Sequence, residues 1–274
     1  MSLRTALAVA TVALGSVLFA AEMPWAESYE AAQAKAKEEN KVVMVDFYTD
    51  WCTWCKRLDE ETFSNEQVIE AARNLVVVKV NAEEEGVELA EKFNVTGYPT
   101  VIFASPDGEK IGTVVGYMPP EDFLPNIQTA ALVTTRVPEI QAALEEQPTV
   151  ELHLEMIKFK EFAGDSLGVV SHLEKAIELG YEGDDISEKY FLAGDAQVNA
   201  GGWEASLPYF EKALGTAKTD VDKAYALAGL TYSNANLQNM ETAAEYAKQI
   251  LAIESDDPNV EGLKSFAEQY AGNE

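Results

Sequence analysis

Cysteine and histidine are scarce in this chain of 274 residues, which holds two of each. A structural zinc site needs about four ligands, and Cys52 and Cys55 lie far along the chain from His153 and His172. A zinc site is therefore disfavoured. Basic residues are also few: 20 Lys and Arg stand against 47 Asp and Glu, for a net charge of −27. Such a surface repels nucleic acid and anionic membranes. We expect the acidic surplus to serve solubility, with a cationic partner as the open alternative.

Long apolar runs are missing after residue 21. At the N-terminus, Arg4 precedes an uncharged, mostly apolar stretch over residues 5–21 that ends in small residues. A basic start, a short apolar core and small residues at its end describe a secretory signal, with cleavage after Ala20 or Ala21. The stretch also reaches the lower limit of a membrane span, so an uncleaved anchor is the alternative. We predict a signal peptide over 1–21 and a periplasmic or secreted mature protein with no membrane contact, in a compartment where disulfides persist.

The two cysteines form a Cys-x-x-Cys pair directly after the apolar run 42–48, which predicts a strand. At a strand-to-helix junction the first sulfur lies at a helix N-terminus, where unpaired N–H groups and the helix dipole stabilise a thiolate. Thiolate is the reactive form of cysteine. An inert structural bridge is the alternative, but closing a four-residue loop removes little entropy from the unfolded chain. The spacing of Cys52 and Cys55 therefore favours redox chemistry.

Residues 23–133 alternate between helix and strand patterns. Apolar runs predict strands over 42–48, 75–81, 100–104 and 110–115. Helices are expected over 26–39, from the cysteines to about 61, from a capping signature at 64–67 onward, over 86–93, and from Pro120. Strands that alternate with helices and end in a hairpin indicate an α/β layer architecture.

This half resembles the thioredoxin superfamily, and within it the C-terminal periplasmic domain of DsbD-type thiol-disulfide interchange proteins and secreted thioredoxin-like proteins. Four stretches carry the resemblance, in order: 45–56 (VDFYTDWCTWCK), 61–64 (ETFS), 93–100 (FNVTGYPT) and 116–118 (GYM). Together they are far more specific than a lone Cys-x-x-Cys. The resemblance implies an α/β thioredoxin-like fold and thiol-disulfide exchange. The sequence shows no nucleotide, flavin or metal signature, so we expect no cofactor.

The resemblance also implies roles for single residues. Cys52 corresponds to an exposed nucleophile and Cys55, less exposed, to the cysteine that resolves the mixed disulfide. Pro99 matches a cis-proline beside the disulfide, and the backbone of Tyr98 pairs with the bound substrate chain. Asp46 corresponds to a buried carboxyl with a raised pKa that takes and returns the proton of Cys55. From the residues alone, Pro99 could be an ordinary trans proline and Asp46 an exposed aspartate at a strand end.

Three further residues lie next to or between the cysteines or on the helix that follows them. Trp51 resembles the family's tryptophan that shields the disulfide. Trp54 is one of the two intervening residues, which affect redox potential in the family. The intervening pair is Thr-Trp where cytosolic thioredoxins have Gly-Pro, so the direction of electron flow is open. Asp59 follows Cys55 by four positions and can share its helix face, either to tune the thiols or as a solvated charge.

From about Pro138 strand signals stop and a helical repeat begins. The segment from Gly194 to Leu214 fits the tetratricopeptide pattern, which returns at Gly229, 35 residues after Gly194. A fainter copy begins at Gly164, and 258–270 is expected to form a capping helix. A period near 34 indicates stacked helix pairs that bury their apolar faces against neighbours. We therefore predict a redox domain over 22–133 and an all-α, TPR-like solenoid over 138–274, in which His153 and His172 are ordinary helix residues.

The sequence leaves three hypotheses for function. The first is an exported reductase of partner-protein disulfides, whose TPR-like half binds a client or partner. The second is the same site working as a disulfide-donating oxidase. The third is a non-enzymatic interaction protein. Because the chain has only two cysteines, the redox hypotheses require a separate redox partner for regeneration, besides protein thiols or disulfides as substrates.

Overall fold

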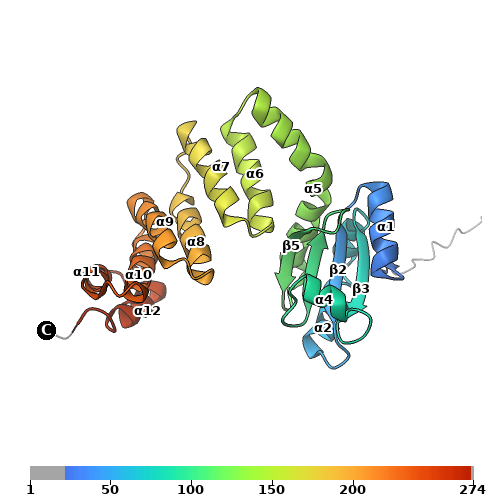
Figure 1. Cartoon of the computed structure of the whole chain (residues 1–274), viewed down its shortest axis with the longest axis horizontal. Coiled ribbons are helices and arrows are strands. Elements are labelled where there is room, and N and C mark those ends of the chain that lie inside the picture. The colour runs from blue at the N-terminus through green and yellow to red at the C-terminus, as the bar shows by residue number, and fades with distance from the viewer. Residues whose placement is uncertain (1–21, 273–274) are drawn as a thin grey trace, which may run out of the picture.

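The computed structural model describes residues 22–272, which form a five-stranded sheet flanked by helices and then an array of helices (Figure 1). The predicted signal peptide lies outside the described residues. Within residues 22–272, no helix combines the length and the apolar character that crossing a bilayer requires.

The sheet has the order β1-β3-β2-β4-β5. Its strands are β1 (Trp25–Ala26), β2 (Val43–Tyr48), β3 (Val76–Asn81), β4 (Thr100–Ala104) and β5 (Lys110–Val115). Strands β1 and β2 run parallel to β3, whereas β4 is antiparallel to β2 and β5. The four strands predicted from apolar runs are confirmed. The two-residue β1 is too short to give a sequence pattern, and it was not predicted.

Helices cover both faces of the sheet. They are α1 (Tyr29–Glu39), α2 (Thr53–Arg57), the π-helical turn η1 (Leu58–Thr62), α3 (Glu66–Ala72) and α4 (Val87–Lys92). Because strand side chains alternate between faces, Val43, Val45 and Phe47 pack against α1 and α4. Met44 points the other way, into a core shared with η1 and α3. Asp46 has the same parity as Met44, so it lies on the face that carries the cysteine helix.

A single helix, α5 (Pro120–Glu146), joins the sheet to the helical array. Its first half packs Phe123 and Ile127 on the sheet, while Ile140 packs with Met156 and Phe159 of α6 (Val150–Phe162). The boundary expected between residues 133 and 138 therefore falls inside a continuous helix. The division of the chain into two domains stays a prediction.

Helix α6 also contacts the sheet directly. The ring of Phe162 lies 5.2 Å from that of Phe103 on β4, and it fills the space that a Cβ at Gly112 on β5 would need. Arg136 of α5 binds Glu155 of α6 through two hydrogen bonds of 2.6 and 2.7 Å. The start of the array is thereby held against the edge of the sheet.

The array continues with α7 (Ser166–Glu178), α8 (Ile186–Asn199), α9 (Trp203–Thr216), α10 (Asp220–Asn236), α11 (Met240–Leu251) and α12 (Pro258–Ala267). Successive helices match the expected copies and the expected terminal helix, but membership of the tetratricopeptide class stays a prediction. Phe210 of α9 is wedged between Gly194 of α8 and Gly229 of α10, where an added Cβ would meet its ring at 2.6 and 2.5 Å. The glycines at these two positions of the predicted repeat pattern thus leave room for the large ring of Phe210.

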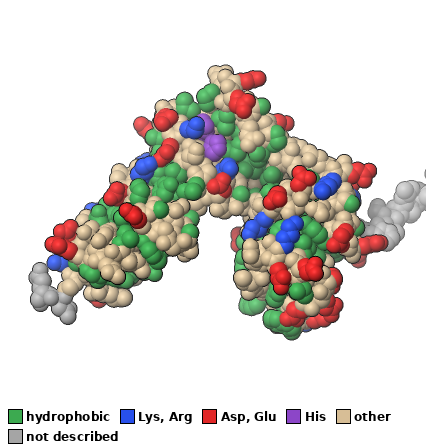
Figure 2. Space-filling model, viewed as in Figure 1, with side chains coloured by type: hydrophobic (Ala, Val, Ile, Leu, Met, Phe, Trp, Pro, Cys, Tyr) green, Lys and Arg blue, Asp and Glu red, His purple; other side chains and the backbone are tan. Residues whose placement is uncertain are grey.

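The two histidines of the chain meet between α6 and α7. Nδ1 of His153 lies 3.0 Å from Nδ1 of His172, so one ring donates a hydrogen bond to the other. Their atoms, in purple, lie together on the visible face (Figure 2). Both were predicted to be ordinary helix residues, and their contact was not foreseen, because residues 19 positions apart meet only once the helices pack. Among the described residues, no group of three or more His, Cys, Asp or Glu side chains could hold a metal ion.

We expect Gly229→Ala to destabilise the array by about 1–3 kcal/mol, because the new methyl group overpacks against Phe210. Gly215→Ala is the matched control: it lies in α9, and no heavy atom lies within 4 Å of its added Cβ. That change should raise the free energy of unfolding by up to about 1 kcal/mol, since alanine is the better helix former. Urea unfolding followed by circular dichroism measures both. Equal effects of the two variants would contradict the wedge.

Candidate active site

The cysteines follow directly from the end of the central strand. The chain leaves β2 at Tyr48 and turns through residues 49–51 to Cys52, the N-cap residue of α2. The N–H of Cys52 donates to the carbonyl of Thr49 at 3.1 Å. Cys52 and Cys55 form a disulfide, and Sγ of Cys52 accepts the N–H of Cys55 at 3.0 Å. That N–H would stabilise a thiolate on Cys52 when the bond opens.

Exposure does not separate the two cysteines. Each is only 3% exposed, so the expectation of an exposed Cys52 beside a less exposed Cys55 is wrong for this closed, disulfide-bonded state. In this state both sulfurs lie at the start of α2. What distinguishes Cys52 is its N-cap position, because its sulfur receives the backbone hydrogen bond.

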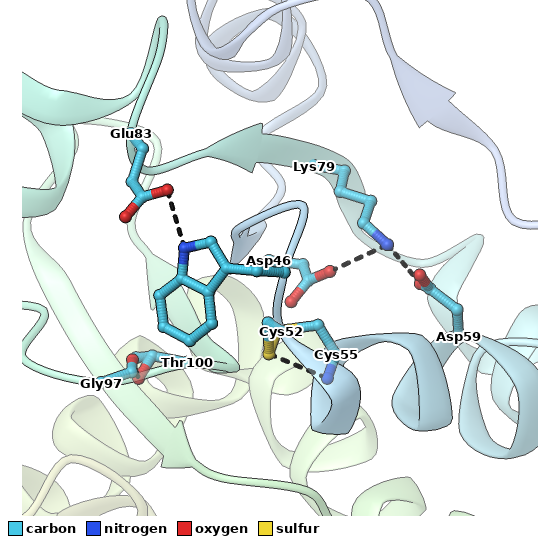
Figure 3. The surroundings of a disulfide bond; sticks show 9 residues. Asp46, Cys52, Cys55, Asp59, Lys79, Glu83, Gly97 and Thr100 are labelled. Carbon is cyan, nitrogen blue, oxygen red and sulfur yellow. Dashed lines mark hydrogen bonds and ion pairs between the residues drawn. A yellow bond between two sulfur atoms is a disulfide. The ribbon is translucent and has the colours of Figure 1, made fainter.

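Asp46 is buried beneath the pair, and the alternative of an exposed strand end is wrong. Its side chain is 1% exposed and its Oδ1 has no hydrogen-bond partner among the described residues. Figure 3 shows its carboxyl group between the cysteines and Lys79. Burial raises the pKa of Asp46 to about 7, although the ammonium of Lys79 acts in the opposite direction. This carboxyl group can therefore hold or release a proton near neutral pH.

Lys79 links Asp46 to Asp59. Its Nζ lies 3.5 Å from Oδ2 of Asp46 and also forms an ion pair with Asp59 (Figure 3). Asp59 acts on Asp46 by adding a nearby negative charge, which raises the pKa of Asp46. Sequence reasoning missed Lys79. It is the lone charge in an apolar strand and faces Asp46 across the β2–β3 register, and this isolated charge was the available signal.

The segment before β4 completes the site. The Tyr98–Pro99 peptide bond is cis, as the resemblance implied. Around it, Oγ1 of Thr100 donates to the carbonyl of Gly97, and the N–H of Gly116 donates to the carbonyl of Pro99, both at 2.8 Å. These bonds tie the cis-proline segment to the end of β5.

Trp51 connects the cysteine loop to this segment. Its ring meets that of Tyr98 edge-on, with centroids 6.2 Å apart, and its Nε1 donates to Glu83 at 2.9 Å. The indole is nevertheless 66% exposed. Glu83 was not predicted, because its position in the loop after β3 gives no pattern in the sequence.

Trp54, between the two cysteines, is 54% exposed. Its ring lies 5.9 Å from that of Tyr117, and the guanidinium of Arg57 lies over both rings. Glu61 accepts hydrogen bonds from Arg57 and from the hydroxyl of Tyr117. Tyr117 and Glu61 belong to the stretches that carry the family resemblance, yet no role was assigned to them. Two exposed tryptophans, Trp51 and Trp54, thus belong to the cysteine motif itself.

Comparison with known proteins agrees with this geometry. The thioredoxin-like domain family matches residues 29–131. The thiol:disulfide interchange protein DsbD of Yersinia pestis (strain Pestoides F) is 35% identical over 104 residues, which cover 36% of this chain and 18% of that protein. The protein of the same name from Campylobacter jejuni (strain RM1221) is 34% identical over 104 residues, covering 37% and 18%. The chain thus spans less than a fifth of the length of these relatives.

Two solved structures are also similar. A thioredoxin from Thermus thermophilus has 28% identity and a TM-score of 0.39, covering 43% of this chain and 93% of its own. The C-terminal domain of Neisseria meningitidis DsbD in the reduced form has 25% identity and a TM-score of 0.33, covering 37% and 92%. On the family match, residues 29–131 of this chain are a thioredoxin-like domain.

Proposed function

We propose that the protein is an exported thiol-disulfide oxidoreductase that reduces disulfides of partner proteins through Cys52 and Cys55. One observation carries the proposal: the pair closes a disulfide at the start of α2, directly above a buried carboxyl group whose pKa is about 7. Similarity to relatives named thiol:disulfide interchange proteins supports it. The helical half, in this proposal, recruits the client or redox partner.

The reaction begins on the reduced protein. The Cys52 thiolate attacks one sulfur of the partner disulfide; a mixed disulfide forms and the other partner sulfur leaves as a thiolate. Cys55, deprotonated by Asp46, then attacks Sγ of Cys52. The Cys52–Cys55 bond forms, and the second partner sulfur leaves and takes up a proton. Two electrons have passed to the partner, so a separate dithiol must reduce the chain again.

Asp46 suits the proton step because nothing else uses its free oxygen. Oδ1 has no partner among the described residues, and a pKa of about 7 allows the carboxyl group to accept a proton from Cys55 and return it at neutral pH. Lys79 and Asp59 are positioning residues in this scheme. They act through Asp46: Lys79 holds Oδ2 of Asp46, and Asp59 adds a negative charge beside that carboxyl group through its ion pair with Lys79.

The cysteine roles predict opposite phenotypes. Cys52→Ser should abolish reduction of insulin disulfides in a dithiothreitol-coupled turbidity assay. Cys55→Ser should retain the first attack and accumulate a mixed disulfide visible on non-reducing gels, because nothing then resolves it. Circular dichroism checks that both variants fold. Activity that survives in Cys52→Ser would refute the mechanism and favour a non-enzymatic interaction protein.

The raised pKa of Asp46 predicts how stability depends on pH. An unfolded aspartate ionises near pH 4, whereas Asp46 in the fold ionises at about 7. The fold therefore binds the proton more tightly, and the free energy of unfolding should fall as pH rises from about 4 to about 7, then level off. Three pKa units correspond to a loss of about 4 kcal/mol.

Asp46→Asn removes that ionisation. The variant should lack the fall between pH 4 and 7, and it should be more stable than the wild type at pH 8, as measured by urea unfolding of the oxidised protein. Glu109→Gln, an exposed acid on the β4–β5 turn, should leave the profile unchanged. Asp46→Asn should also slow release of the mixed disulfide about tenfold or more. A parallel profile for Asp46→Asn and the wild type would exclude a titration of Asp46 near pH 7.

The direction of electron flow has its own test. The Thr-Trp pair between the cysteines leaves open an oxidase that donates its disulfide. Equilibrating the protein with glutathione or dithiothreitol buffers gives the reduction potential. We expect a value near that of thioredoxin, about −270 mV, for a reductase. A value near about −120 mV, like that of a strong oxidant, would reverse the direction.

A further inference from the structure

The helical array contains a cavity of about 640 Å³ that lies apart from the cysteine site. It lies between α8, α9, α10 and α12, and aromatic side chains from all four helices line it: Phe191, Trp203, Phe210, Tyr225, Tyr232 and Phe266. Its volume falls in the range of ligand-binding sites, which are mostly apolar with a few placed polar groups.

The rings hold one another in place. Phe191 lies with its centroid 5.5 Å from those of both Phe210 and Tyr225, and Trp203 meets Tyr232 edge-on at 5.5 Å. Phe210 is itself fixed between two glycines, as described above. Tyr225 and Tyr232 remain 36% and 41% exposed. Their exposed faces leave aromatic surface open to a ligand at the mouth of the cavity.

One carboxylate contributes to the lining of the cavity. Asp195 is the single charged side chain in the lining, where Oδ2 accepts a hydrogen bond from Asn199 at 3.0 Å. No lysine or arginine lines the cavity. The cavity beside His153 and His172, by contrast, is lined by Lys160 and Lys175. Aromatic faces attract cations, so the rings, Asp195 and the net charge of −27 all favour a positively charged group.

We propose that this cavity binds an arginine side chain presented by an apolar segment of the redox partner or client. Arginine fits because its planar guanidinium stacks on aromatic faces while it donates paired hydrogen bonds to a carboxylate. The apolar neighbours of the arginine pack on the remaining rings. This inference deepens the proposed function, since it names the chemistry by which the helical half recruits the protein that exchanges electrons with Cys52.

The test uses the full chain and two peptides. The probe is the peptide acetyl-Ala-Leu-Arg-Leu-Ala-amide. The control peptide has citrulline in place of arginine, because citrulline keeps the shape of arginine but is uncharged. Isothermal titration calorimetry at low salt should show the arginine peptide binding at least tenfold more tightly. Asp195→Asn and Tyr225→Leu should each weaken binding of the arginine peptide about fivefold or more. Glu188→Gln and Leu192→Ala, exposed positions on α8 outside this lining, should not change it.

Equal binding of the two peptides would overturn the proposal in favour of an apolar groove. Absence of binding at millimolar peptide, or indifference to Asp195→Asn in a folded variant, would also overturn it. Self-association through the same residues in sedimentation experiments would replace the partner with a second copy of the chain. The redox proposal and the binding proposal can fail independently. Cys52→Ser should leave peptide binding intact, and Asp195→Asn should leave reduction of a small aromatic disulfide unchanged.

Discussion

Burial of the central strand β2 on both faces is the constraint on which the site depends. Val43, Val45 and Phe47 point toward α1 and α4, so the residues between them must point into the opposite core. That parity places Asp46 in a dry environment on the side of the cysteine helix, where ionisation is costly. The same strand ends just before Cys52, and it thereby delivers the sulfurs to the start of α2. The direction and the end of this one strand thus position both the disulfide and the buried carboxyl group.

The helix α5 fixes the second half of the protein to the first, because it packs into the cores of both. A linker would let the two halves move independently, but here Phe123 and Ile140 of one helix belong to two different cores. Phe162 of α6 then packs on β4 and β5. The array is therefore in packed contact with the sheet through α5 and α6, and it is not tethered by a linker.

Much of the site was accessible from the sequence, because its residues sit in short motifs. The Cys-x-x-Cys pair is a local pattern, whereas the burial of Asp46 and the cis bond at Pro99 were open from the residues alone and followed only from the family resemblance of the stretches that contain them. Lys79 and Glu83 were missed, since Asp46 and Trp51, which they face or bind, lie more than 30 positions away in the chain and are reached only across the sheet or between loops. The prediction that Cys52 is more exposed than Cys55 was wrong, because the exposure of each cysteine depends on how the closed disulfide packs.

The sequence by itself determined the α/β order, the cysteine pair at a strand-to-helix junction and the change to an all-helical second half, because alternation, capping and spacing are local properties of a chain. The tertiary structure decided where these elements meet. It joined the halves through α5, brought His153 to His172, and gathered aromatic residues from four helices into one cavity lining with Asp195. Such contacts depend on packing between segments distant in sequence, and no local pattern encodes which side chains will share a cavity once the helices have closed against one another.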